Sequence, residues 1–259
     1  MITRLKIVLV ALASAAILTG CGESYTWGWH VVSPSLERGR GNIAFLLSGV
    51  GYTVAVAVCA ITISVVLGLL VALPGLSSNR LGRTASRGYV ELLRSVPMLV
   101  MVLWVYYGLP VILNVSLDVF TSGVIALALC DSAFEAEIFR AGIQSISRGQ
   151  HEAADALGLR YFHKLRFIIM PQAIRRVLPA LGNQFVYMLK TSSLLSVIGL
   201  TELTRRANEL VVTEYRPLEI YTFLVLEYLV LILVVASIIR SLERRMGAAE
   251  HGNASPAAT

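Results

Sequence analysis

The sequence predicts an all-α integral membrane protein, and three features support this fold class. Of its 259 residues, 56% are hydrophobic and only 15% are charged, whereas soluble domains carry about 25% charged residues. The mean hydropathy is +0.72. Five apolar stretches are long enough for transmembrane helices, each of which needs about 20 residues. These five core spans are predicted at residues 46–73, 89–109, 119–139, 177–200 and 220–239.

The N-terminal residues are predicted to form a separate segment. Two basic residues precede an apolar run that is too short to cross a bilayer comfortably. The Leu-Thr-Gly-Cys sequence that ends at Cys21 resembles the lipobox of a bacterial lipoprotein signal, which would make Cys21 a lipidation site after cleavage. The alternative is a short extra transmembrane helix that is retained. We therefore predict a signal-like or short transmembrane segment over 1–21 and a periplasmic linker over 22–45.

The first two spans are joined by a short basic loop. The first span contains no charged residue and ends at Pro74 and Gly75. In the second span, Glu91 and Arg94 are three residues apart, so their side chains can pair near its inner end. Pro97 follows, and it predicts a kink because proline lacks the backbone N–H that a helix interior uses.

The third span carries three carboxylates, Asp131, Glu135 and Glu137. Charged groups in a membrane helix are costly unless they are paired or hydrated, so each is a candidate functional residue. Glu137 lies three residues before Arg140, and the two are predicted to pair. Asp131 is the better candidate for a polar cavity. The alternative is that this end of the span simply reaches the inner interface.

The fourth span contains Lys190, which is followed by three hydroxyl residues that include Ser192 and Ser193. A lysine at membrane depth should face protein or water. The hydroxyl residues indicate irregular backbone, which membrane proteins place along cavities. The alternative is that Lys190 pairs with Asp131 or Glu227 only for assembly.

The remaining segments and the charge distribution predict the topology. Residues 201–219 are predicted to form a loop, and 247–259 a disordered tail. With the loop between the third and fourth spans inside, fifteen lysines and arginines lie on the inner side and five on the outer side. The positive-inside rule then places the N-terminal side of the core outside and the C-terminus in the cytoplasm.

The most informative stretch, residues 149–171, lies between the third and fourth spans. The run over 150–157 predicts two helical turns with one small apolar face made of alanines and a leucine. Gly158 can supply a left-handed C-cap. A second helix is predicted from about residue 160, and Pro171 is expected to end or kink it. A small-faced helix between two membrane spans is suited to docking in a groove of a partner protein.

This stretch resembles the cytoplasmic coupling loop of the permease subunits of binding-protein-dependent ABC importers. The signature of that loop is Glu-Ala-Ala, three residues, Gly, nine residues, then Ile-x-Leu-Pro, with methionine replacing the leucine here. The resemblance implies that a separate ATPase contacts the matching and flanking residues, which are Gly149, Gln150, Glu152, Ala153, Ala154, Gly158, Ile168 and Pro171.

The resemblance extends over residues 46–246, the predicted permease domain. Arg94 to Pro97 and Glu137 to Gln150 are similar to the polar amino acid branch, which includes histidine, glutamine and glutamate–aspartate permeases. Relatives carry Lys-Asp-Thr-Ser where this chain has Lys190 followed by Thr-Ser-Ser, so any role that needs that acid is in doubt here. Candidate residues for the translocation path are Arg94, Asp131, Glu137, Lys190, Ser192 and Ser193.

The implied function is a non-catalytic translocation subunit of the bacterial inner membrane that imports polar amino acids. The implied partners are an ATP-binding subunit, a periplasmic or lipid-anchored solute-binding protein, a second permease subunit and membrane lipid. The chain lacks a Gly-x-x-x-x-Gly-Lys-Ser/Thr loop, so ATP would be bound by the partner and the chain itself needs no cofactor.

Other classes are less well supported by the residues. A self-contained, ion-coupled secondary transporter usually shows internal repeats, and none is visible. An intramembrane protease with a Ser–His pair is excluded because no histidine falls in a predicted span. The three cysteines and four histidines have no metal-ligand spacing. The basic residues form no patch for nucleic acid.

Overall fold

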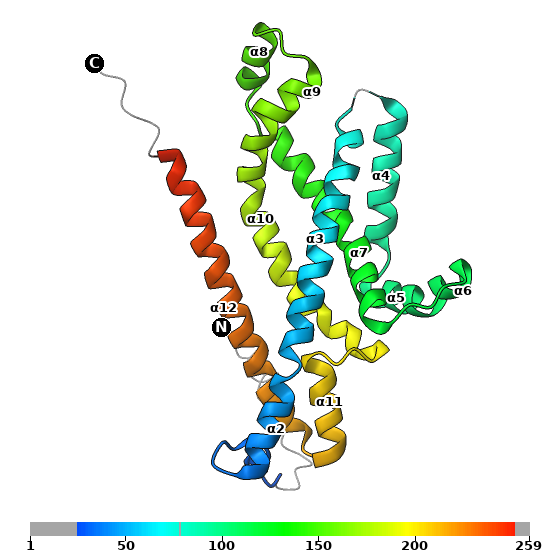
Figure 1. The fold of residues 1–259 in the computed structure, drawn as a ribbon, viewed down its shortest axis with the longest axis vertical. Coiled ribbons are helices and arrows are strands. Elements are labelled where there is room, and N and C mark those ends of the chain that lie inside the picture. The colour runs from blue at the N-terminus through cyan, green and yellow to red at the C-terminus, as the bar shows by residue number, and fades with distance from the viewer. Residues whose placement is uncertain (1–24, 78, 252–259) are drawn as a thin grey trace, which may run out of the picture.

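The computed structural model describes residues 25–77 and 79–251, and these are helical with no strand (Figure 1). The predicted segment 1–21 and Cys21 lie outside the described residues. The α-helices are α2 (Glu37–Leu47), α3 (Val50–Gly75), α4 (Arg80–Ser95), α5 (Met98–Leu103), α6 (Leu109–Leu113), α7 (Val119–Gln144), α8 (Arg148–Ala156), α9 (Tyr161–Lys164), α10 (Met170–Thr191), α11 (Leu203–Glu214) and α12 (Pro217–His251). Two short 3₁₀ helices are η1 (Trp29–Val32) and η4 (Ser192–Ile198) among the described residues, and two single π turns are η2 (Trp104–Gly108) and η3 (Leu165–Ile169).

Helices α3 and α7 form the centre of the fold. They cross at small residues, and an added Cβ on Gly68 of α3 would lie 2.4 Å from the Cβ of Glu135 on α7. Small residues are favoured where membrane helices meet, because the hydrophobic effect does not drive helices together in lipid and close packing must do so. The main buried cluster accordingly includes several alanines of both helices: Ala57, Ala60, Ala126, Ala128, Ala133 and Ala136.

Three helical stretches are long and apolar enough to cross a membrane: Glu37–Gly75, Val119–Gln144 and Pro217–Arg244. The first combines α2 with α3, so the predicted linker over 22–45 contains helix α2. Helix α3 ends at Gly75, as its Pro-Gly sequence predicts. Helix α12 continues to His251, into the predicted tail, and residues 252–259 are not described.

The second predicted span is sharply bent instead of continuous over 89–109. Helix α4 starts at Arg80, and the chain turns by 97° before the stretch Met98–Leu113. Val96 is extended, because a following proline disfavours helical backbone in the preceding residue. The break predicted at Pro97 is confirmed, but it redirects the chain so that α5 and α6 project sideways from the bundle (Figure 1).

The fourth predicted span is carried by α10 and η4. The irregular backbone predicted after Lys190 is confirmed, because a 3₁₀ helix runs over Ser192–Ile198 and ends at Gly199 with φ +94°. The loop predicted over 201–219 is wrong, since it contains α11. The buried residues of that helix, Leu203, Ala207 and Leu210, recur at helical spacing.

Different helices form the two ends of the bundle. Helices α8 and α9 lie at one end, and α2 and α11 lie at the other (Figure 1). At the α2–α11 end, the guanidinium of Arg38 donates two hydrogen bonds to the Glu214 carboxylate, at 2.7 and 3.0 Å. Asn42 donates to the same carboxylate at 3.0 Å. The segment before α3 is therefore attached to the end of α11.

Candidate coupling and translocation site

Helix α8 is a short helix with a defined start and end. Ser147 is extended before it, and the helix covers Arg148–Ala156. Gly158 has φ +69°, which confirms the predicted left-handed cap. The N–H of Leu159 donates to the carbonyl of Ala154 at 3.1 Å, so the last turn is closed in the manner of a glycine-terminated helix.

The coupling segment is attached firmly to the helix that follows it. Lys164 pairs with Asp155 at 2.7 Å, which joins α8 to α9. Gln172 of α10 donates to the Gln150 side chain of α8 at 3.0 Å. A small buried cluster lies beside these contacts. It contains Ile143 of α7, Ile146 just after α7, Ile169 of η3 and Ala173 of α10. A displacement of α8 is therefore expected to be passed to α10.

The small face predicted for the coupling helix is divided in the structure. Ala154 is buried against its own chain, whereas Glu152, Ala153 and Leu157 are exposed. The prediction that both alanines and Leu157 share one docking face is therefore wrong for Ala154. Helical geometry separates consecutive residues by about 100°, so one of two neighbouring alanines can face the protein while the other faces solvent.

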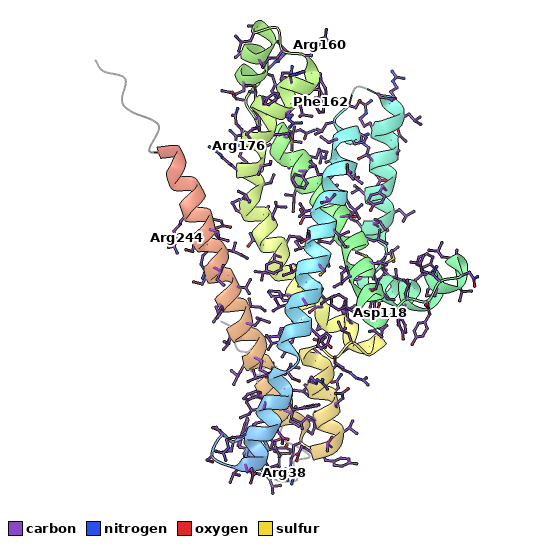
Figure 2. All side chains as sticks on the ribbon, viewed as in Figure 1. Arg38, Asp118, Arg160, Phe162, Arg176 and Arg244 are labelled. Atoms are coloured by element: carbon purple, nitrogen blue, oxygen red, sulfur yellow. The ribbon has the colours of Figure 1, made fainter. Side chains whose placement is uncertain are left out.

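Exposed aromatic residues beside α8 were missed by the sequence reasoning. Tyr161 and Phe162 are 61% and 64% exposed, and Phe167 is 60% exposed. Phe162 and Arg160 lie at the same end of the molecule as α8 (Figure 2). A clustering of aromatic residues in an otherwise charged loop is the sequence signal that would have identified them.

Ile168 and Pro171 lie in the continuous helical path from α9 to α10. Ile168 is half-buried in the π turn η3, and Pro171 is exposed in the first turn of α10. The α-helix that begins at Tyr161 gives way at Leu165 to the π turn η3, which ends directly before α10, and the chain stays helical through Pro171. A π turn interrupts the regular α-helical hydrogen bonds, so the regular α-helix is broken in the turn before the proline.

A polar cavity of about 510 Å³ lies between the end of α3 and the facing sides of α4 and α7. Two predicted path residues, Arg94 and Glu137, line it together. Arg140 donates to Glu137 at 3.0 Å, which confirms their predicted pairing. The Arg94 guanidinium lies 5.0 Å from the centre of the Phe134 ring. The predicted Glu91–Arg94 pair is not among the ion pairs of the described residues. The full lining is Gly75, Leu76, Ser77, Arg83, Ser86, Arg87, Val90, Glu91, Arg94, Glu137, Arg140 and Gln144.

Asp131 does not line this cavity with Arg94 and Glu137, and its predicted place along the translocation path stays a prediction. It is fully buried, and its carboxylate accepts hydrogen bonds from Ser64 of α3, at 2.6 Å, and from Gln184 of α10. The sequence reasoning missed both partners, which are ordinary polar residues inside apolar stretches.

The residues around η4 differ in exposure. Lys190 is exposed on α10. No ion pair joins it to Asp131 or Glu227 among the described residues, so the alternative of an assembly pair has no support within this chain. Ser192 is buried and donates to the carbonyl of Leu189 at 2.8 Å. The Ser193 hydroxyl donates to the carbonyl of Lys190 at 2.8 Å. Both hydroxyls satisfy backbone groups where the helix changes type.

Most of the chain matches the sequence model of a known family. Residues 64–248 match the model of the binding-protein-dependent transport system inner membrane component. The chain belongs to this family. The permease is thus a multi-pass inner membrane translocation subunit, and members of the family work with an ATPase and a solute-binding protein.

Relatives of known function agree with this assignment. The permease is 36% identical over 219 residues to the glutamine transport system permease protein GlnP of Escherichia coli (strain K12), covering 84% of this chain and 97% of that one. It is 34% identical over 204 residues to the arginine transport system permease protein ArtQ of Bacillus subtilis (strain 168), covering 79% and 93%. These matches support an ABC permease and give no support to the ion-coupled alternative.

Solved structures share the architecture. The permease is 37% identical to a chain of an amino acid ABC transporter crystallised with histidines. The two superpose with a TM-score of 0.76, and the match covers 85% of this chain and all of that one. The inward-facing MetNI methionine ABC transporter superposes with a TM-score of 0.68 at 18% identity, over 79% and 97% of the two chains. The second likeness concerns the fold alone.

Proposed function

We propose that this permease imports polar amino acids and that ATP hydrolysis by a separate subunit drives the import. The relatives named for glutamine and arginine transport support this substrate class. The observation that carries the proposal is the exposed face of α8, which a partner can contact while the ion pair of Asp155 with Lys164 holds α8 to the next helix.

The ATPase docks on Glu152, Ala153 and Leu157, with the exposed Tyr161 and Phe162 beside them. Leu157 is 76% exposed, and large apolar side chains that gather on a surface mark a contact with another protein. A helix with exposed alanine and leucine fits a groove on the partner. This end of the bundle is cytoplasmic, and the α2–α11 end is periplasmic, in agreement with the distribution of basic residues.

The amino acid passes the cavity that Arg94 and Glu137 line. An amino acid carries a carboxylate and an ammonium group, and the cavity offers guanidinium and carboxylate groups that complement both. A second permease subunit covers α10, because exposed Lys190 lies within a membrane helix and needs protein or water beside it.

Lipidation of Cys21 stays a proposal. The mass of the purified N-terminal peptide tests it.

Proteoliposomes that contain the permease, its ATPase and its solute-binding protein test this function. We expect accumulation of radiolabelled glutamine, arginine or glutamate only when ATP is enclosed with the ATPase. Glu152→Lys should abolish ATPase association and uptake while membrane insertion stays intact. Glu37→Lys, a charge reversal at another exposed glutamate at the opposite end, should leave both unchanged. Uptake driven by an ion gradient without the ATPase would contradict the proposal.

A further inference from the structure

Asp131 joins three helices deep in the bundle. Its side chain comes from α7 and is fully buried. One carboxylate oxygen accepts a hydrogen bond from Ser64 of α3 at 2.6 Å, and the other accepts from Gln184 of α10. Hydrogen bonds to a carboxylate are strong where water does not compete, so this site holds the three helices in one arrangement.

The three helices differ in what they are attached to. Helix α10 continues from α9 and η3, and the Gln172–Gln150 contact ties it to α8. Helices α3 and α7 pack against each other at Gly68, where an added Cβ would meet α7 at 2.4 Å. A movement that starts at α8 therefore reaches α10. Arg176 of α10 donates to Ser145 at the inner end of α7, and deeper in the bundle the Gln184 side chain donates to Asp131 of α7.

We propose that Asp131 is the joint that transmits movement of α10 to α3 and α7 during transport. The proposal rests on the proposed function, because the ATPase supplies that movement. Asp131 is then a positioning residue, and it does not contact the transported solute. Two sites are coupled only if one structural element responds to both, and the Ser64–Asp131–Gln184 link provides such an element.

The same helix provides a matched control. Glu135 lies four residues after Asp131 on α7 and is also fully buried. Neither of its carboxylate oxygens has a hydrogen-bond partner among the described residues. Glu135→Gln therefore changes a buried carboxyl group on α7 without breaking a link between helices.

A conservative substitution of Asp131 can keep the joint. In Asp131→Asn the amide oxygen can accept from Gln184, and the amide nitrogen can donate to the Ser64 hydroxyl. Ser64 has another acceptor available, because its hydroxyl also lies 3.0 Å from the carbonyl of Ile61. Asp131→Leu has the same branching and the same number of side-chain heavy atoms, is larger because methyl groups replace the oxygens, and keeps neither link.

The test measures solute molecules taken up per ATP hydrolysed in proteoliposomes of the whole transporter. We expect this ratio to fall about tenfold in Asp131→Leu and in Gln184→Leu, since each removes a hydrogen bond between a buried carboxylate and α10. The rate of ATP hydrolysis should remain near the native value. Asp131→Asn and Glu135→Gln should keep the native ratio.

Several outcomes separate the joint from a merely structural role. A native ratio in Gln184→Leu would overturn the proposal, and this variant decides the matter if Asp131→Leu does not fold. A fall in hydrolysis and uptake by the same factor in Asp131→Leu and Glu135→Gln would also overturn it, because burial alone would explain the loss. If the native complex does not couple ATP to uptake at all, the proposed function fails instead.

Discussion

Helices α7 and α12 have similar lengths in the membrane but opposite environments. The most apolar stretch of α7 has a mean hydropathy of 1.5 and is 67% buried, whereas that of α12 has a mean hydropathy of 2.6 and is 6% buried. The less apolar helix is the one inside. Lipid tails solvate large aliphatic side chains as well as a protein interior does, so small and polar residues distinguish the central helix. Helix α7 carries Gly123, Asp131 and Ser132 at buried positions.

The largest difference is expected between a leucine of each helix. Leu127 of α7 is fully buried, and Leu229 of α12 is 50% exposed. We expect Leu127→Ala to lower the free energy of unfolding by about 2–5 kcal/mol, because it leaves a cavity. Leu229→Ala should cost roughly 0.5 kcal/mol, as surface substitutions do. Denaturant unfolding in detergent micelles measures both, and equal losses would break the comparison.

Two glycines of α3 test whether close approach to α7 matters. Gly68 has no room for a Cβ beside Glu135, whereas a Cβ on Gly51 would meet nothing within 4 Å. Gly68→Ala should cost about 1–3 kcal/mol, the usual range for overpacking. Gly51→Ala should be neutral or slightly stabilising, since alanine favours helix. The thermal midpoints of the two purified variants provide the measurement, and a loss at Gly51 as large as at Gly68 would argue against the tight crossing.

The coupling segment should respond locally to loss of its ion pair. Lys164→Met removes the partner of Asp155 and keeps a side chain of similar length. We expect faster hydrogen exchange in α8, corresponding to about 0.5–1 kcal/mol of local stability, since partly exposed pairs contribute little. Exchange in α7 should not change. Faster exchange throughout α7 would show that the ion pair stabilises the whole fold and not α8 alone.

The smallest effect is expected from pH at the α2–α11 end. Burial opposes ionisation of Glu214, but hydrogen bonds from Arg38 and Asn42 and the charge of Arg38 outweigh it and lower its pKa below the ordinary value of 4.5. A carboxylate whose pKa is lowered in the folded state stabilises the fold at pH values above its ordinary pKa. This stabilisation is lost as the pH falls through the lowered pKa of the folded state. Hydrogen exchange in α2 should therefore increase only in acid. In Glu214→Gln that increase should disappear, and an unchanged pH response would contradict the assignment.

Local signals in the sequence predict the coupling helix and its end. The alanines predict a short helix and Gly158 predicts its left-handed cap, and the structure has both. Asp131 could be identified as unusual from its position in an apolar stretch. Its partners could not, because Ser64 and Gln184 are 67 and 53 residues away along the chain, and no local pattern distinguishes them from other polar residues.

Other errors have identifiable physical causes. The charges of residues 201–219 predict a loop, but Leu203, Ala207 and Leu210 recur at helical spacing and bury one face of helix α11. Pro97 predicts a break in the helix. The angle of 97° depends on how α5 packs against α7, so it cannot be predicted from the residues around the proline. Which of two adjacent alanines faces a partner likewise depends on tertiary packing.

Cross-linking of neighbouring positions on α8 tests the central claim most directly. In a permease without its native cysteines, Ala153→Cys places a thiol on the exposed face of α8, and Ala154→Cys places one on the buried face. With the ATPase bound in inner membrane vesicles, a short thiol cross-linker should join the ATPase to the first variant and not to the second. Cross-linking of neither variant, or labelling of Ala153→Cys in intact cells by a reagent that cannot cross the membrane, would contradict the account.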